Sequence, residues 1–207
     1  MRNRSNILVG APDVKSAGGV LIGSAAPDEA NYPSDASAKL PEALKVAPAG
    51  YISEDGVTKT VDRSTEKIKD WNGDTVIITQ SDHSVTLKLT FLEAANAEVL
   101  KVIAGDDNVA VKGNSVTVID TADELPHRSF VFEIHGGEGK HIRVFAPDAQ
   151  ATEVGDVSYV RSDVVKYEVT LECFPDAEGK KLIQFIDRPA DDPAPTGPES
   201  GTGDEAA

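Results

Sequence analysis

The strongest constraint on the fold is the alternation of apolar and polar residues over HSVTLKLTF, residues 83–91. A period of two residues predicts a strand, and burial of a single face is typical of an antiparallel sheet. The apolar face comprises Val85, Leu87, Leu89 and Phe91. The run TVIITQS at 75–81 reads as a strand that precedes it. The segment therefore predicts a small β-core.

One amphipathic α-helix is predicted next, over about residues 91–104. Thr90 and Glu93 stand at capping-box spacing, and Gly105 is placed to end the helix in a left-handed C-cap. The expected packing residues form a stripe at spacings of three and four. They are Leu92, Ala95, Val99, Val102 and Ile103.

Three later segments read as β-hairpins, because each carries Gly, Asn or Asp where a tight turn needs them. They are VAVKGNSVTVID, RSFVFEIHGGEGKHIRVFAP and KYEVTLECFPDAEGKKLIQFID. Residues 151–160 are a further candidate strand. Together these elements predict a mostly-β protein, an antiparallel β-sandwich or barrel packed by one helix.

The chain has 207 residues, of which 40% are hydrophobic, so one domain over 1–187 is expected. Residues 1–16 look like a flexible arm, and the Pro-, Gly- and acid-rich residues 188–207 look like a disordered acidic tail. Residues 27–70 are rich in Pro, Asp, Ser and Gly and read as one long loop. Because connectors beyond about 12–15 residues are usually functional or disordered, we expect this loop to contact another subunit.

The candidate interface residues are the large apolar or acidic side chains of this loop and of the turn after it. They are Tyr32, Leu40, Leu44, Tyr51, Ile52, Glu54, Asp55 and Trp71. Trp71 stands just before Asn72 and Gly73, a turn signal, and a lone Trp there is more often a core or interface anchor than a ligand platform.

Composition limits the possible partners. A net charge of −15 opposes tight binding of nucleic acid, which depends on Lys and Arg contacts to phosphate. No apolar run approaches the 18 or so residues of a membrane span. The lone cysteine, Cys173, excludes an intramolecular disulfide, fits a reducing compartment and is expected to be buried and inert.

No pattern of catalytic, cofactor-binding or metal-binding residues emerges. HGGEGKH at 135–141 fails the phosphate-loop pattern, because Ile134 replaces the first glycine and His141 replaces the Ser or Thr. Ser84 and His83 are adjacent in a strand, so their side chains point to opposite faces. The four histidines lack an evident third ligand for zinc. We therefore expect no enzyme and no cofactor.

Three stretches carry a family resemblance: GYISEDGV, DRSTEKIKDWNGDTV and SVTLKLTFLEAANAEVLKVIAG. Over residues 50–105 the chain resembles the major tail tube protein of long-tailed, non-contractile bacteriophages of the siphovirus type. The first twenty residues and the C-terminal tail do not contribute. The resemblance implies a β-sandwich packed by one helix, with six subunits closing a ring and rings stacking into a tube through which the genome passes.

The resemblance also implies partners and a location. The partners are further copies of the chain, the tape measure, tail terminator and distal tail proteins, and passing double-stranded DNA without tight binding or contact with a membrane. The location is the virion tail, after assembly in the host cytoplasm. Six copies of a chain charged −15 would carry −90, which favours an electronegative conduit.

Two other functions stay open at this point. The tube of a contractile tail or injection system shares the general fold. A stand-alone acidic β-sandwich that binds a carbohydrate or peptide is the second alternative, although an aromatic content of 5% does not favour an aromatic-lined cleft.

Overall fold

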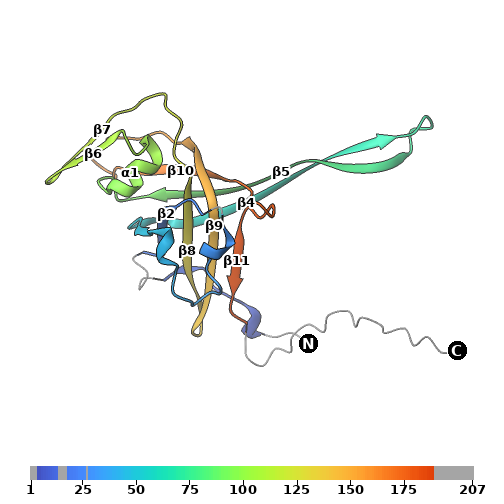
Figure 1. Cartoon of the computed structure of the whole chain (residues 1–207), viewed down its shortest axis with the longest axis horizontal. Coiled ribbons are helices and arrows are strands. Elements are labelled where there is room, and N and C mark those ends of the chain that lie inside the picture. The colour runs from blue at the N-terminus through green and yellow to red at the C-terminus, as the bar shows by residue number, and fades with distance from the viewer. Residues whose placement is uncertain (1–3, 14–17, 27, 189–207) are drawn as a thin grey trace.

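The computed structural model describes residues 4–13, 18–26 and 28–188. They form one nine-stranded antiparallel sheet, a separate two-stranded sheet and one α-helix (Figure 1). The predicted mostly-β class with a single helix is confirmed. The large sheet does not close on itself, so within the described residues it is an open, curved sheet rather than a barrel.

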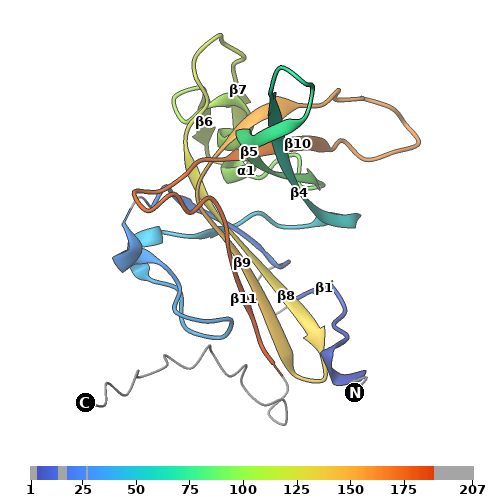
Figure 2. The same ribbon diagram turned by 90° about the vertical axis from the view of Figure 1, so that its right-hand side faces the viewer.

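The spatial order of the large sheet is β3 (Ala47–Pro48), β2 (Val20–Ser24), β8 (Arg128–Gly137), β9 (Lys140–Val154), β10 (Tyr167–Cys173), β5 (Thr75–Phe91) and β4 (Ile52–Lys69). Two further strands lie off this path: β1 (Ala11–Pro12) pairs with β8, and β11 (Ile183–Ile186) pairs with β9. Strands β8 and β9 hold most of the large sheet together: β8 pairs with β1 and β2, β9 pairs with β10 and β11, and the two pair with each other. Figure 2 shows β8, β9 and β11 running side by side away from the helix.

Strand β8 separates two apolar clusters, because successive side chains of a strand point to opposite faces. Phe130 and Phe132 enter the main core with Phe91, and Val131 enters a second cluster with Phe145. All five side chains are at most 1% exposed. Full burial of one such side chain contributes about 1.5–3 kcal/mol to the stability of the fold. Strand β8 therefore stabilises both apolar clusters.

Two of the three expected hairpins form. Strands β6 (Val109–Lys112) and β7 (Ser115–Val118) pair across Gly113, whose φ of 61° suits glycine. Strands β8 and β9 pair across the turn at Glu138 and Gly139. These two predictions are right because local turn chemistry determines both pairings.

The third hairpin prediction is wrong, because β10 and β11 do not pair with each other. Both lie on the same edge of β9: β11 pairs with residues 142–145 and β10 with residues 149–154. The expected turn does form, since the Asp176 carboxylate accepts the N–H groups of Glu178 and Lys180. The chain then continues along β9, which is long enough to hold both strands. The candidate strand at 151–160 ends at Val154, as the last part of β9.

The expected loop over 27–70 is wrong in its second part, because residues 52–69 form strand β4. Residues 28–51 are irregular apart from β3 and two short 3-10 helices, η3 (Glu29–Asn31) and η4 (Glu42–Leu44). The two expected runs at 75–81 and 83–91 are one continuous strand, β5. The sequence does not predict β4 as a strand, because most of its residues face no core and therefore show no alternation of apolar and polar residues.

Helix α1 (Ala97–Ala104) begins later than predicted. Its N-cap is Asn96, whose side chain accepts the N–H of Glu98. The expected capping box is wrong because Thr90 remains in β5, while the Glu93 carboxylate accepts the N–H of Tyr51 at 3.1 Å. Gly105 follows the last residue with φ 96° and ψ 154°, outside the left-handed helical region that was expected.

The expected helix stripe is partly realised. Val99 and Val102 are buried in the main core, and Ile103 packs against it. Leu92 and Ala95 precede the helix, where Leu92 is half-buried and Ala95 is exposed. At eight residues, α1 is short, and no helix in the described ranges is long and apolar enough to cross a membrane.

Part of the expected flexible N-terminal arm is fixed. After η1 (Arg4–Asn6), the N–H of Val9 donates to the carbonyl of Gly136, and that of Asp13 donates to the carbonyl of Glu133. This segment therefore continues the edge of β8 beyond β2. Residues 1–3 and 14–17 lie outside the described residues, as does the predicted acidic tail except for Arg188.

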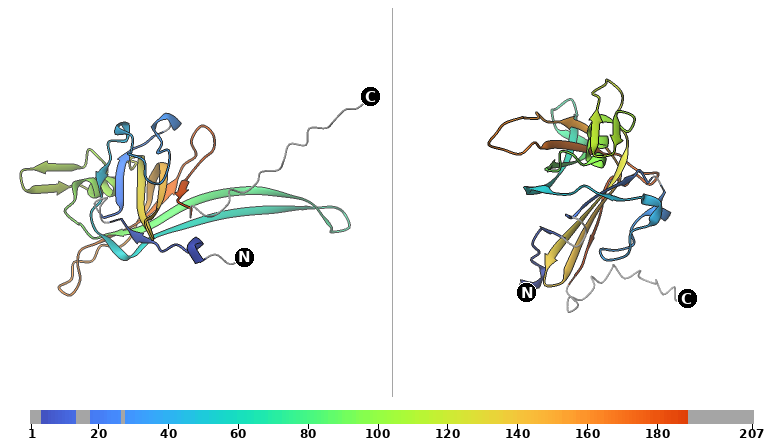
Figure 3. Two further views of the ribbon diagram at one scale, coloured as in Figure 1. Left: turned by 90° about the horizontal axis from the view of Figure 1, so that it is seen from below. Right: turned by 90° about the vertical axis from the view of Figure 1, so that its left-hand side faces the viewer.

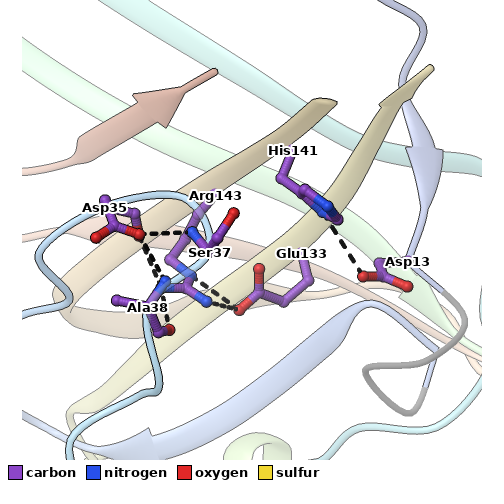
Figure 4. A network of polar contacts seen from close by, with 7 residues as sticks. All are labelled: Asp13, Asp35, Ser37, Ala38, Glu133, His141 and Arg143. Carbon is purple, nitrogen blue, oxygen red and sulfur yellow. Dashed lines mark hydrogen bonds and ion pairs between the residues drawn. The ribbon is translucent and has the colours of Figure 1, made fainter. Parts of the chain in front are cut away.

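A buried ion pair ties the irregular segment 28–51 to the sheet (Figure 4). Glu133 on β8 and Arg143 on β9 are 7% and 5% exposed, with Nη2 and Oε1 2.8 Å apart. Arg143 Nη1 also donates to the carbonyls of Asp35 and Ala38. The Asp35 carboxylate accepts the N–H groups of Ser37 and Ala38, and these hydrogen bonds close the turn and lower the pKa of Asp35.

Cys173 is 0% exposed, as expected for an inert thiol. Burial raises its pKa to about 12, so the reactive thiolate is disfavoured at neutral pH.

Glu133→Ala is expected to lower the free energy of unfolding by about 3–5 kcal/mol, because Arg143 would stay buried without its counter-charge. Glu42→Ala is the matched control, since it removes the partner of Lys39 in an ion pair whose side chains are 82% and 87% exposed. The control should cost less than about 1 kcal/mol. Urea denaturation measures both, and equal small effects would contradict the role given to the buried pair.

Candidate assembly surface

The β4–β5 hairpin has an inner part that belongs to the body and an outer part that projects from it. Its inner part belongs to the body, because residues 86–91 of β5 pair with β10 and Leu87 and Leu89 are at most 2% exposed. Every residue from 61 to 82 is exposed, and Figures 1 and 3 show this part leaving the body as a narrow ribbon. We refer to residues 61–82 as the arm.

The tip of the arm is an ordered turn. The Asp70 carboxylate accepts the N–H groups of Asn72 and Asp74, at 3.0 and 2.9 Å. The N–H of Gly73, which has φ 91°, donates to the carbonyl of Asp70. This geometry leaves Trp71 102% exposed, so the largest side chain of the protein projects into solvent.

The arm presents further apolar side chains along its length. They are Val61, Ile68, Val76, Ile77 and Ile78, each between 44% and 62% exposed. An isolated two-stranded ribbon is marginally stable in water, and exposed apolar side chains gathered on one element mark an interaction surface. The arm therefore has the properties of a surface that a partner covers.

The structure divides the candidate interface residues into two groups. Tyr32, Leu40 and Leu44 belong to the second apolar cluster, and Ile52 packs against the main core. The ring of Tyr32 meets that of Phe145 edge-on, and its hydroxyl donates to Asp176, a contact that together with burial raises the pKa of Tyr32. These four side chains contribute to the fold of their own chain.

The remaining candidates lie on the surface. Tyr51 is 74% exposed, and Glu54, Asp55 and Trp71 are exposed as well. Of these, only Trp71 lies on the arm. The role of these four residues in an interface stays a prediction.

Sequence reasoning missed the apolar residues Ile68, Val76, Ile77 and Ile78. Three of them are consecutive, and consecutive apolar residues in a strand place apolar groups on both of its faces. That pattern at 76–78, next to a polar strand partner, was the available signal for an exposed two-faced ribbon.

The histidines do not gather into a metal site in the described part of the chain. His135 and His141 face each other across the β8–β9 pair with ring centroids 5.7 Å apart, and Asp13 lies 3.9 Å from His141. Within the described ranges, no three His, Cys, Asp or Glu side chains gather as a metal site would require.

Comparison with known proteins gives a family match over most of the chain. The family model described as phage tail tube protein matches residues 14–197. No curated protein matches the sequence.

Solved structures give distant similarities. The sheath–tube complex of an extracellular contractile injection system (PVC) has a TM-score of 0.41 at 14% identity, over 66% of this chain and 86% of that chain. The anti-feeding prophage cap, described as the AFP tube terminating cap, has a TM-score of 0.43 at 8% identity, over 89% and 97%. The PVC sheath/tube terminator has a TM-score of 0.37 at 12% identity, over 65% and 86%.

Because Trp71 is the single tryptophan of the chain, its fluorescence reports on the arm tip alone. In the folded, dilute protein the emission should match that of a fully hydrated indole and should be open to quenching by acrylamide. On self-association at high concentration, the emission should shift to the blue and quenching should fall, because a neighbouring copy covers the tip. An emission that stays red and quenchable in the associated state would contradict an interface role for Trp71.

Proposed function

The chain belongs to the phage tail tube protein family, and from this premise we propose that six copies close into a ring and that rings stack into the tube of a long-tailed, non-contractile phage. The protein is a structural component of the virion tail, and its family is not an enzyme family. The finer assignments, namely the ring of six, the stacking and the tail type, are the proposal.

The observation that supports the proposal is the arm. A subunit that acts alone gains no stability from a ribbon whose residues are exposed on both faces, and it risks aggregation through the free edge of β4. A subunit of a tube can use such an element to reach a neighbouring copy. The apolar side chains and the ordered Trp71 turn give that copy a defined surface to cover.

The charge of the chain suits a conduit. Six copies at −15 carry a formal −90 per ring. Screening at physiological salt acts over about 8 Å, so acidic groups that line a narrow lumen still repel passing phosphate. In this proposal the tube is a non-adhesive channel for genome ejection. It is assembled in the host cytoplasm, and its further partners are the tape measure, tail terminator and distal tail proteins.

Shortening the arm should abolish tube formation and keep the fold. Asp62 and Ser84 are cross-strand partners, so replacing residues 63–83 by Asn-Gly closes the hairpin with a two-residue turn in the existing register. The unmodified protein should form rings or filaments in negative-stain electron microscopy at high concentration. The shortened variant should stay folded and monomeric, with a melting temperature only slightly lowered because Lys181 loses the carbonyl of His83 as its acceptor. Filaments formed by it would contradict the role of the arm.

The lumen proposal has its own test. Assembled tubes should not retain double-stranded DNA fragments in a gel-shift assay at low salt, where surface electrostatics is strongest. A structure of the tube should show an inner wall with an excess of Asp and Glu over Lys and Arg. A neutral or basic inner wall would contradict the electronegative conduit while leaving the tube itself intact.

A further inference from the structure

The arm separates its charges by sign onto its two faces. In an antiparallel pair, residues that face each other across the strands share a face, and successive residues of one strand alternate between faces. Arg63 pairs with His83 and Lys67 with Ile78, so both cations share one face. Arg63 also donates to Gln80, the partner of Thr65 on that face.

The opposite face carries the acids. Asp62, Glu66 and the partner of Ser64, Asp82, all fall on it by the same register. Lys69, close to the tip, continues the alternation of β4 on the cationic face. Along the strands of the arm, each face therefore has one sign of charge, and we name the two the basic face and the acidic face.

These charges are available for contact. All the charged positions of the arm are exposed. The ion pairs among the described residues involve other side chains, so no described residue forms an ion pair with either face of the arm. The spacing also matches, because Arg63 and Lys67 stand four residues apart on one face, and Asp62 and Glu66 stand four apart on the other.

We propose that the basic face of one arm docks on the acidic face of the arm of the next copy. This inference rests on the proposed function and names the surfaces through which neighbouring subunits recognise each other. Like faces repel, so two arms cannot pair through the same face. Unlike faces give a head-to-tail contact, which closes into a ring when the rotation between copies divides a full turn.

Two half-reversed variants provide the test. Arg63→Glu with Lys67→Glu turns the net charge of the basic face negative, although Lys69 remains on it. Asp62→Lys with Glu66→Lys turns the net charge of the acidic face positive, although Asp82 remains on it. Each variant alone should sediment as a monomer under conditions where the unmodified chain assembles. An equimolar mixture of the two should assemble, because each then finds the opposite sign, and a single chain carrying all four changes should assemble alone.

The control is Lys112→Glu with Arg161→Glu, which changes the net charge by the same amount as Arg63→Glu with Lys67→Glu, at exposed positions outside the arm. It should assemble like the unmodified chain. Circular dichroism should show all variants folded, because the substituted side chains are exposed in the monomer.

Co-assembly of the mixture by analytical ultracentrifugation and electron microscopy, with monomers from each variant alone, would support the proposal. Normal assembly of the Arg63→Glu, Lys67→Glu variant by itself would overturn it and leave the proposed function standing. A mixture that stays monomeric would overturn it as well. Failure of the unmodified chain to assemble would overturn the proposed function and this inference together.

Discussion

The pairing of the inner part of β5 with β10 holds the β4–β5 hairpin, and with it the arm, in place. Among the described strands β4 pairs only with β5, so the backbone pairing of the hairpin with the body consists of six residue pairs between Tyr167–Glu172 and Thr86–Phe91. The inner residues of β5 bury Leu87, Leu89 and Phe91 in the main core. Burial of these three side chains anchors the arm, which has no core of its own. It also sets the direction in which the arm leaves the sheet.

The sequence predicts those parts of the fold that local interactions determine. The turns at Gly113 and Gly139 join neighbouring strands, and their hairpins are right. The prediction that β10 and β11 pair with each other is wrong, because both pair with β9 instead. No local signal in the sequence reveals that β9 is long enough to hold both. The start of α1 shifts from Thr90 to Asn96 for a similar reason, since pairing with β10 keeps β5 extended through Phe91.

The candidate site was harder to predict than the fold, because an apolar residue in a polar segment can pack either on the core of its own chain or on another molecule. Leu44 and Tyr32 cover the core of their own chain, since Arg143 and the turn at Asp35 draw residues 28–51 back onto the sheet. Trp71 lies in an equally polar setting but projects, because the Asp70 turn points it away from the body. Composition cannot separate these outcomes, since both depend on contacts between distant parts of the chain.

Exposed apolar side chains on an edge strand normally invite aggregation, and charges along that edge are the usual protection. The arm combines the two, so in the proposed assembly its association would be selective rather than merely favourable. Faces of opposite sign admit one mode of docking and oppose the others. Whether that mode closes a ring then depends on the angle between arm and body. Bulges near Ser64 and Ile68 bend and twist the ribbon at defined points, so the backbone itself contributes to that angle.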